Sequence, residues 1–259
     1  MSKKVDFVAQ LQRLYTWSAV GYIGLAILAG VFMANVTYQT TIGHLTKDIL
    51  ASHKSAVLVP GAHAFIDIPL KWALVAMLGL SAVLPVLYLT RLKKYHQKAL
   101  KKRVLLSRWV DLGLSTVFMM STIALLSGVN DMMTIKMIGG LVALTCAMGW
   151  LAERAMTEGK KLVMPIFTFS LITGCLPWIV VAAYAVATPF FASVRASWFV
   201  YALYASTLFG CGLIAYNQWR YHQGKRAFKD YMFVERNYVV ASILVRTAFA
   251  AILVLGLRK

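Results

Sequence analysis

Two opposite charges lie inside apolar stretches of this chain, and the chemistry that they suggest is ion pairing. Arg246 lies in the middle of the last apolar stretch, YVVASILVRTAFAAILVLGL, and Asp111 lies in RWVDLGLSTVFMM. A guanidinium stays protonated in proteins, so at that depth it needs an anionic partner to offset the cost of leaving water. Asp111 is the most deeply placed carboxylate of the other apolar stretches. We therefore predict an Arg246–Asp111 pair; the alternative is that Arg246 reaches an interface or meets backbone carbonyls.

Three neighbouring side chains are candidates for the same region. Ser242 lies one helical turn before Arg246, and Ser115 lies one turn after Asp111, so either hydroxyl could join the pair. A serine in a helix also commonly bonds to its own backbone. Trp178 follows Pro177, and its ring could line an internal pocket, although packing is the more common role for such a residue.

Patterns for other chemistry are missing from the sequence. No histidine pair has metal-ligand spacing on one helix, and no GxSxG, HExxH or phosphate-loop motif occurs. The three cysteines all lie in apolar segments, which is typical of buried packing residues. We therefore expect no metal site, and an enzyme is the function class with the least support.

The composition indicates an integral membrane protein. Of the 259 residues, 60% are hydrophobic, whereas an ordinary soluble domain is about half apolar. The net charge of +18 would suggest nucleic-acid binding in a soluble protein. Here the basic residues cluster between apolar stretches, which favours a role in membrane topology and contact with anionic headgroups instead. We expect no nucleic-acid partner.

Seven apolar segments of about 20 residues are each long enough to cross the hydrocarbon core as a helix. They predict an all-α membrane protein with one seven-helix domain over residues 1–259, with helices at 15–34, 69–90, 105–129, 134–152, 163–187, 198–219 and 237–257. Residues 35–68 form the one long external loop. VTYQTTIG and SAVLVPG within it favour a short strand pair, with an ordered loop lacking strands as the alternative.

The basic residues also predict the orientation. Lys and Arg concentrate in the N-terminal segment and in the second, fourth and sixth connections, which places the N-terminus in the cytoplasm and the C-terminus outside. The densest run is RLKKYHQKALKKR. Topology determination is the simplest role for this run, and contact with anionic lipid or an acidic cytoplasmic protein is the other.

Four segments of the chain are distinctive: RWVDLGLSTVFMM with the following GVNDM, the pair Gly149–Trp150, GCLPWIVVAAYAVA and ERNYVVASILVRTAFA. In these segments, and over nearly its whole length, the chain resembles the heliorhodopsin family. The orientation predicted above, with the N-terminus in the cytoplasm and the C-terminus outside, agrees with this family. The resemblance implies a seven-helix light sensor, usually a homodimer, in which all-trans retinal is joined to a lysine of the last helix as a protonated Schiff base. A carboxylate of the third helix is the counterion.

Carried over residue by residue, the resemblance brings one agreement and several departures. The counterion position falls on Asp111, as an aspartate where a glutamate is expected, and the serine before the retinal lysine falls on Ser242. The retinal lysine itself falls on Arg246. Two histidines of the family fall on Ile23 and Pro85.

The departure at residue 246 is chemical. A Schiff base needs a neutral primary amine, which a guanidinium does not provide. The lysines inside the predicted spans, Lys71 and Lys136, lie at helix ends. The hypothesis is a heliorhodopsin-like sensory or signalling membrane protein without covalent retinal, in which Arg246–Asp111 replaces the Schiff base and its counterion. The alternatives are a photoreceptor with noncovalent retinal and a small ion channel or transporter.

Overall fold

The computed structural model describes residues 2–47, 58–192, 196–224 and 226–258. Its elements, in chain order, are α1 (Ser2–Phe32), β1 (Thr37–Lys47), β2 (Leu58–Pro69), α2 (Leu70–Leu89), α3 (Lys93–Lys102), α4 (Leu106–Leu126), α5 (Met132–Thr157), α6 (Val163–Ala192), α7 (Trp198–Gln223), a 3-10 turn (Arg226–Lys229) and α8 (Tyr231–Gly256). Seven of these helices, all except α3, are long and apolar enough to cross a membrane. The predicted number of spans is confirmed.

Most helix ends differ from the prediction. Five helices extend further: α1 begins at residue 2 instead of 15, α8 at 231 instead of 237, and α5, α6 and α7 end at 157, 192 and 223 instead of 152, 187 and 219. Hydropathy detects only the lipid-crossing part of a helix, whereas the polar ends continue the same backbone hydrogen bonding beyond it. In contrast, α2 and α4 are slightly shorter than predicted, at 70–89 and 106–126.

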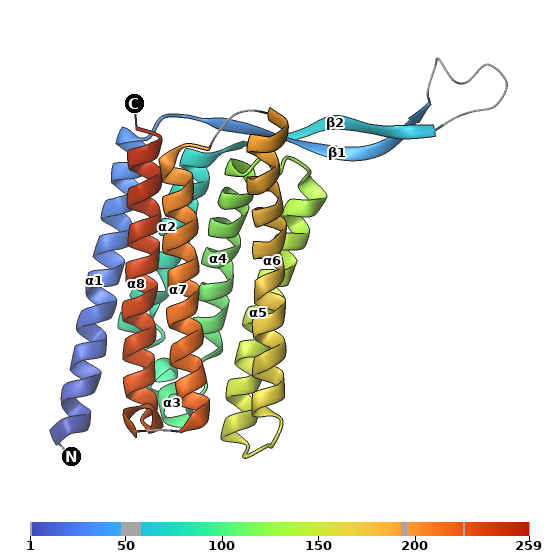
Figure 1. The fold of residues 1–259 in the computed structure, drawn as a ribbon. Coiled ribbons are helices and arrows are strands. Elements are labelled where there is room, and N and C mark those ends of the chain that lie inside the picture. Colours follow the sequence, from blue (N-terminus) through green and yellow to red (C-terminus); the bar gives the residue numbers. More distant parts are fainter. Residues whose placement is uncertain (1, 48–57, 193–195, 225, 259) are drawn as a thin grey trace.

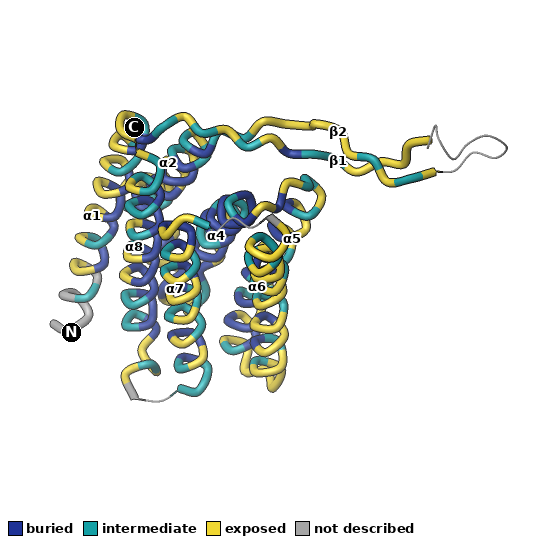
Figure 2. The backbone as a smooth tube through the Cα atoms, turned by 45° about the horizontal axis from the view of Figure 1, so that its top comes forward, coloured by how far each residue is buried: buried dark blue, intermediate teal, exposed yellow. Residues whose placement is uncertain are grey.

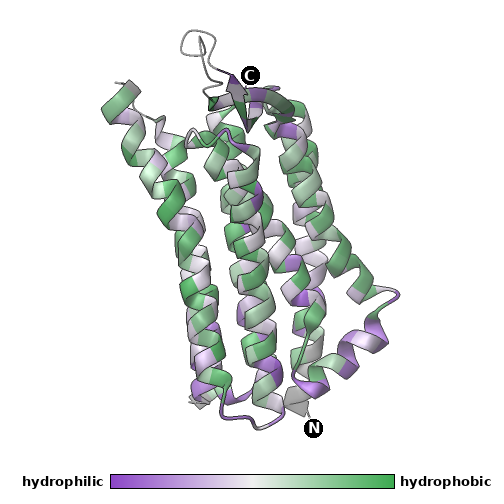
Figure 3. Cartoon of the chain, turned by 90° about the vertical axis from the view of Figure 1, so that its right-hand side faces the viewer, coloured by the Kyte–Doolittle hydropathy of each residue, from purple (hydrophilic) through white to green (hydrophobic). Residues whose placement is uncertain are grey.

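The segment around LKKYHQKALKK forms a helix, α3, where we predicted only a basic connection. His96, Ala99 and Leu100 are buried on one side of it, and the lysines point away. This spacing is that of an amphipathic helix lying against the bundle. Figure 3 shows α3 and the neighbouring connections as largely hydrophilic at the lower end, whereas the middle of the bundle is mostly hydrophobic.

The strand pair predicted in the first long connection is present. β1 and β2 run antiparallel from Thr37↔Pro69 to Lys47↔Leu58, with one irregularity between Gln39 and Thr41. The hairpin lies across one end of the bundle and projects sideways past α5 and α6 (Figure 1). Residues 48–57 of the predicted external loop lie outside the described residues.

The termini lie at opposite ends of the bundle, as an odd number of spans requires (Figure 1). The most enclosed helix is α4: 61% of its most apolar window is buried, against 22% for α6. Figure 2 shows the same contrast, with dark blue concentrated on α4 and α8 and yellow along α6. A charge on α4 or α8 therefore lies in the centre of the protein, whereas most of α6 faces outward.

Candidate functional site

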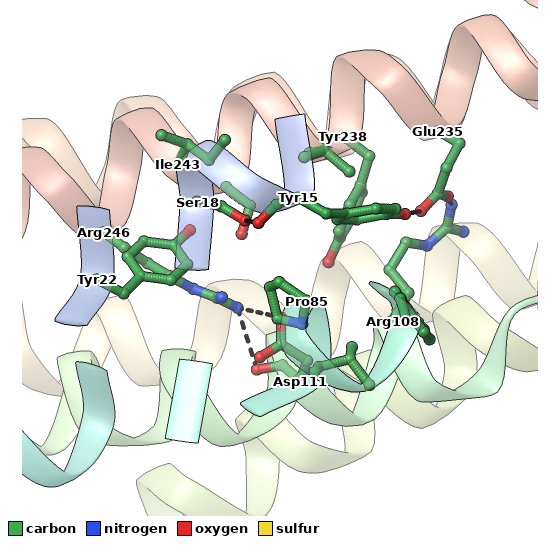
Figure 4. A pocket seen from close by; sticks show the side chains of 14 residues that line it. Tyr15, Ser18, Tyr22, Pro85, Arg108, Asp111, Glu235, Tyr238, Ile243 and Arg246 are labelled. Carbon is green, nitrogen blue, oxygen red and sulfur yellow. Dashed lines mark hydrogen bonds and ion pairs between the residues drawn. The ribbon is translucent and has the colours of Figure 1, made fainter. Parts of the chain in front are cut away.

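Arg246 of α8 and Asp111 of α4 meet inside the bundle (Figure 4). Nη2 of Arg246 donates to Oδ2 of Asp111 at 2.6 Å, to Oγ of Ser115 at 2.8 Å and to the main-chain oxygen of Asp111 at 3.2 Å. The guanidinium also lies 5.5 Å from the ring centre of Tyr22 on α1. Arg246 is 3% exposed and Asp111 is 16% exposed. The structure thus brings together the two residues that we predicted to pair, and Arg246 does not reach an interface.

The pair forms because α4 and α8 start at different depths. Asp111 is five residues from the start of α4, about 8 Å along the helix, whereas Arg246 is fifteen residues from the start of α8, about 22 Å. Since the two side chains touch, α4 starts roughly 14 Å further into the bundle than α8. The chain segment that precedes α4 consists of the turn after α2 and the helix α3.

Of the other predicted residues, Ser115 joins the ion pair, and Ser242 and Trp178 line two different cavities. Ser115 joins the ion pair directly, as predicted, and its own hydroxyl donates to the main-chain oxygen of Asp111 at 2.9 Å. Ser242 is buried and lines a small cavity beside the pair. Trp178 lies elsewhere, in an apolar cavity of about 270 Å³ between α4, α5, α6 and α7. All three cysteines line that same cavity, together with Trp109 and Met120.

A second group of buried charges lies closer to the α3 end of the bundle, and the sequence interpretation missed it. Arg108 of α4 binds Glu153 of α5 through Nη2 at 2.5 Å and Glu235 of α8 through Nη1. Nε1 of Trp109 donates to the second oxygen of Glu153 at 2.9 Å. The sequence analysis predicted the Arg246–Asp111 pair alone, so this second group of buried charges is an addition to it.

A sequence signal for this second group existed at the ends of the predicted spans. Glu153 immediately follows the segment 134–152, and Glu235 precedes the segment 237–257 by two residues. Charges in those places are usually solvated, so hydropathy gives no reason to pair them. Here the longer helices α5 and α8 enclose both carboxylates, which are 0% and 1% exposed. One guanidinium shared by two buried carboxylates joins α4, α5 and α8.

Hydrogen bonds extend this group to the amphipathic helix. The hydroxyl of Tyr15 on α1 donates to Oε1 of Glu235 at 3.2 Å and lies 3.0 Å from Nε2 of His96 on α3. The His96 ring stacks on Tyr88 with ring centres 4.1 Å apart. Burial lowers the pKa of His96 to about 4, so the imidazole is neutral near pH 7. His96, which belongs to the basic run RLKKYHQKALKKR, is thus a buried contact between α3 and the bundle.

Tyr238 of α8 lies between the two groups of charges (Figure 4). Its ring centre is 4.6 Å from the Arg108 guanidinium, and its hydroxyl has no hydrogen-bond partner among the described residues. The small cavity between the groups has a volume of about 30 Å³, enough to hold a water molecule. Within the described parts of the chain, no cluster of three His, Cys, Asp or Glu side chains could hold a metal ion.

The sequence comparison identifies the family. Residues 14–257 match the profile of the heliorhodopsin family. The chain belongs to the heliorhodopsin family. The resemblance seen in the sequence is therefore confirmed, and comparison with curated proteins finds no match.

The structure comparison shows the rhodopsin-like fold of this heliorhodopsin. The chain is similar to the transmembrane domain of the rhodopsin phosphodiesterase of Salpingoeca rosetta, with a TM-score of 0.64 and 15% sequence identity. The match covers 99% of this chain and 88% of the other. At that identity the likeness concerns the fold alone. Family and fold together identify the chain as an integral, multi-pass membrane protein of the heliorhodopsin family.

Proposed function

We propose that this heliorhodopsin is a sensory or signalling membrane protein that does not bind retinal covalently, and that the Arg246–Asp111 pair takes the place of the protonated Schiff base and its counterion. The observation that carries the proposal is the 2.6 Å contact across the bundle between the last and the third membrane-spanning helices. The resemblance of ERNYVVASILVRTAFA to the family's last helix supports it, because the retinal lysine then falls on Arg246.

Arg246 cannot form the Schiff base with retinal that a lysine at this position would form. Condensation with an aldehyde requires a neutral amine, and a guanidinium remains protonated. The spans contain two lysines: Lys71 is the second residue of α2 and Lys136 is the fifth residue of α5. Both helices start at the hairpin end, away from Asp111. Among the described residues, no lysine amine therefore lies beside the candidate counterion.

The ligand-binding part of the proposal concerns the apolar cavity of about 270 Å³ that Trp109 and Trp178 line. Small-molecule sites are usually apolar cavities near this size that contain few polar groups. A noncovalent apolar ligand held there would be sensed through contacts with α4, which also carries Asp111 and Arg108. A photoreceptor with noncovalent retinal in this cavity is the alternative.

Orientation and partners follow from the basic residues. The bundle end that contains the N-terminus and α3 carries most of the Lys and Arg, which favours a cytoplasmic N-terminus and an external C-terminus. On that side, α3 would contact anionic headgroups or an acidic protein. A homodimer is proposed from the family resemblance.

Transport is less well supported. Two buried acids, Glu153 and Glu235, lie toward the α3 end of the bundle, and Asp111 lies near the middle of the bundle beside Arg246. Toward the hairpin end, the acids among the described residues are Asp67 in β2 and Asp131, which caps α5. A path for ions or protons across the whole membrane would need polar groups in both halves.

The test is the visible spectrum of the purified protein with and without all-trans retinal. The wild type should show no hydroxylamine-sensitive band to the red of free retinal, because no amine can form a Schiff base. Arg246→Lys places an amine next to Asp111 and should produce such a band, whereas Arg246→Met should not. A hydroxylamine-sensitive band in the wild type would refute the proposal. A folded Arg246→Lys variant without the band would show that residue 246 is not at the retinal position.

A further inference from the structure

A third cavity opens sideways between α2 and α4, on the outer face of the bundle. Its volume is about 380 Å³, within the roughly 300–1,000 Å³ of small-molecule sites. The walls are apolar, with Met77, Leu80 and Val83 from α2 and Val110, Leu114 and Phe118 from α4. Leu80, Val83, Val110 and Leu114 are each about half exposed. In a membrane this groove would open toward lipid acyl chains.

The floor of the groove is polar because Asp111 lies there. Arg246 binds one carboxylate oxygen, Oδ2, from the inner side. Among the described residues none donates to the other oxygen, Oδ1, and Asp111 keeps 16% exposure beside a fully enclosed arginine. A carboxylate oxygen in an apolar groove is costly unless a donor reaches it.

The opposite wall contributes a second unsatisfied group. Ser81 of α2 lines the groove and is 1% exposed, and its hydroxyl has no hydrogen-bond partner among the described residues. A buried helical serine normally bonds to a main-chain oxygen of its own helix, as Ser115 does to that of Asp111. The residues that line the groove therefore include a carboxylate from α4 and, from α2, a buried serine whose hydroxyl has no partner among the described residues.

We propose that the α2–α4 groove binds a long-chain alcohol from the membrane, that is, an unbranched apolar molecule with one terminal hydroxyl. This hydroxyl would donate to Oδ1 of Asp111 and accept from Ser81, and the chain would lie against Met77 and Phe118. A cationic head is disfavoured because Asp111 already neutralises Arg246, so an added cation would leave a net charge in hydrocarbon. An anionic head would be repelled by Asp111.

This site is separate from the apolar cavity of the proposed function, which lies between α4, α5, α6 and α7. Either proposal can fail without the other. Retinal binding is measured by a visible spectrum, and alcohol binding is measured by where a probe attaches to the chain.

The experiment uses a cetyl alcohol analogue that carries a photoreactive diazirine along its chain, with the purified protein in lipid nanodiscs. Mass spectrometry of the crosslinked protein should place the label on the peptides of α2 and α4. Unlabelled cetyl alcohol should compete, whereas cetyl methyl ether, which lacks the donor, should compete poorly. Ser81→Ala removes one hydrogen bond and should weaken competition by about two- to tenfold.

Matched tryptophan variants separate a site from general lipid contact. Leu114 lines the groove and Leu144 on α5 is equally exposed away from it, at 49% and 50%. Leu114→Trp fills the groove and should abolish the α2–α4 label, whereas Leu144→Trp should leave it unchanged. The proposal would be overturned by equal labelling in both variants or by equal competition from the ether.

Discussion

The two members of the Arg246–Asp111 pair should differ in how much their loss destabilises the protein. Asp111→Leu leaves a guanidinium that is 3% exposed, cannot release its proton and keeps one side-chain partner, Ser115. The expected cost is about 3–5 kcal/mol. Arg246→Met leaves a carboxyl group that can take up a proton and is partly open to the groove, so its expected cost is only about 1–3 kcal/mol.

Replacing both partners removes the pair without leaving a buried charge. The Asp111→Leu/Arg246→Met double variant should therefore lose less stability than Asp111→Leu alone, and it should be within about 1 kcal/mol of the wild type. For a chain of this size, 1 kcal/mol shifts the melting temperature by about 2–4 °C, so Asp111→Leu should melt roughly 6–20 °C lower than the wild type.

The assay is thermal unfolding in one detergent, followed by circular dichroism, for the wild type, both single variants and the double variant. Arg154→Met is the control for the substitution itself. Arg154 pairs with Glu158 at the surface, where both are exposed, so its loss should not change the melting temperature measurably. Additive losses, in which the double variant equals the sum of the singles, would refute the reasoning because they would mean that the two charges do not interact.

Two further predictions concern helix packing and pH. A Cβ at Gly149 would lie 2.4 Å from ring atoms of Trp109, so Gly149→Ala should cost about 1–3 kcal/mol in thermal unfolding. Gly140→Ala is the control, because nothing lies within 4 Å of a Cβ at Gly140. The alanine there should stabilise the helix by up to about 1 kcal/mol. Equal changes of stability in the two variants would contradict the close packing of Gly149 against Trp109. Because burial lowers the pKa of His96 to about 4 from 6.5, the unfolded chain takes up the proton first as the pH falls between these values. The protein should be most stable above about pH 6.5 and lose stability as the pH falls toward 4. The His96→Gln variant, whose glutamine can still bond to Tyr15, should lose less stability over that interval. Identical decreases of the melting temperature in both proteins would rule this out.

The pairing of Arg246 could be predicted from the sequence because the chain leaves few choices. An arginine in the middle of a span cannot become neutral and cannot easily reach water, so it needs an anion at similar depth. Asp111 was the one deeply placed carboxylate in another apolar stretch. This prediction did not require the correct helix ends. In the structure, Asp111 and Arg246 lie at the same depth because α4 starts further into the bundle than α8.

The group formed by Arg108, Glu153 and Glu235 could not be predicted in the same way. All three residues lie near the ends of predicted spans, where a charge is normally solvated and hydropathy is uninformative. Their burial depends on the extensions of α5 and α8 and on α3, which brings His96 against Tyr15. None of these features belongs to the apolar segments themselves.

The sequence by itself determined the seven spans, the hairpin in the first long connection and the need for a partner to Arg246. Each of these follows from a local property: the length of an apolar run, β-branched residues near turn formers, or a charge that cannot be neutralised. The tertiary structure decided which charges near the helix ends are buried, and it made Asp111 both the partner of Arg246 and a lining residue of the α2–α4 groove. Burial depends on neighbours that are distant in sequence, since a side chain leaves water only when other helices enclose it.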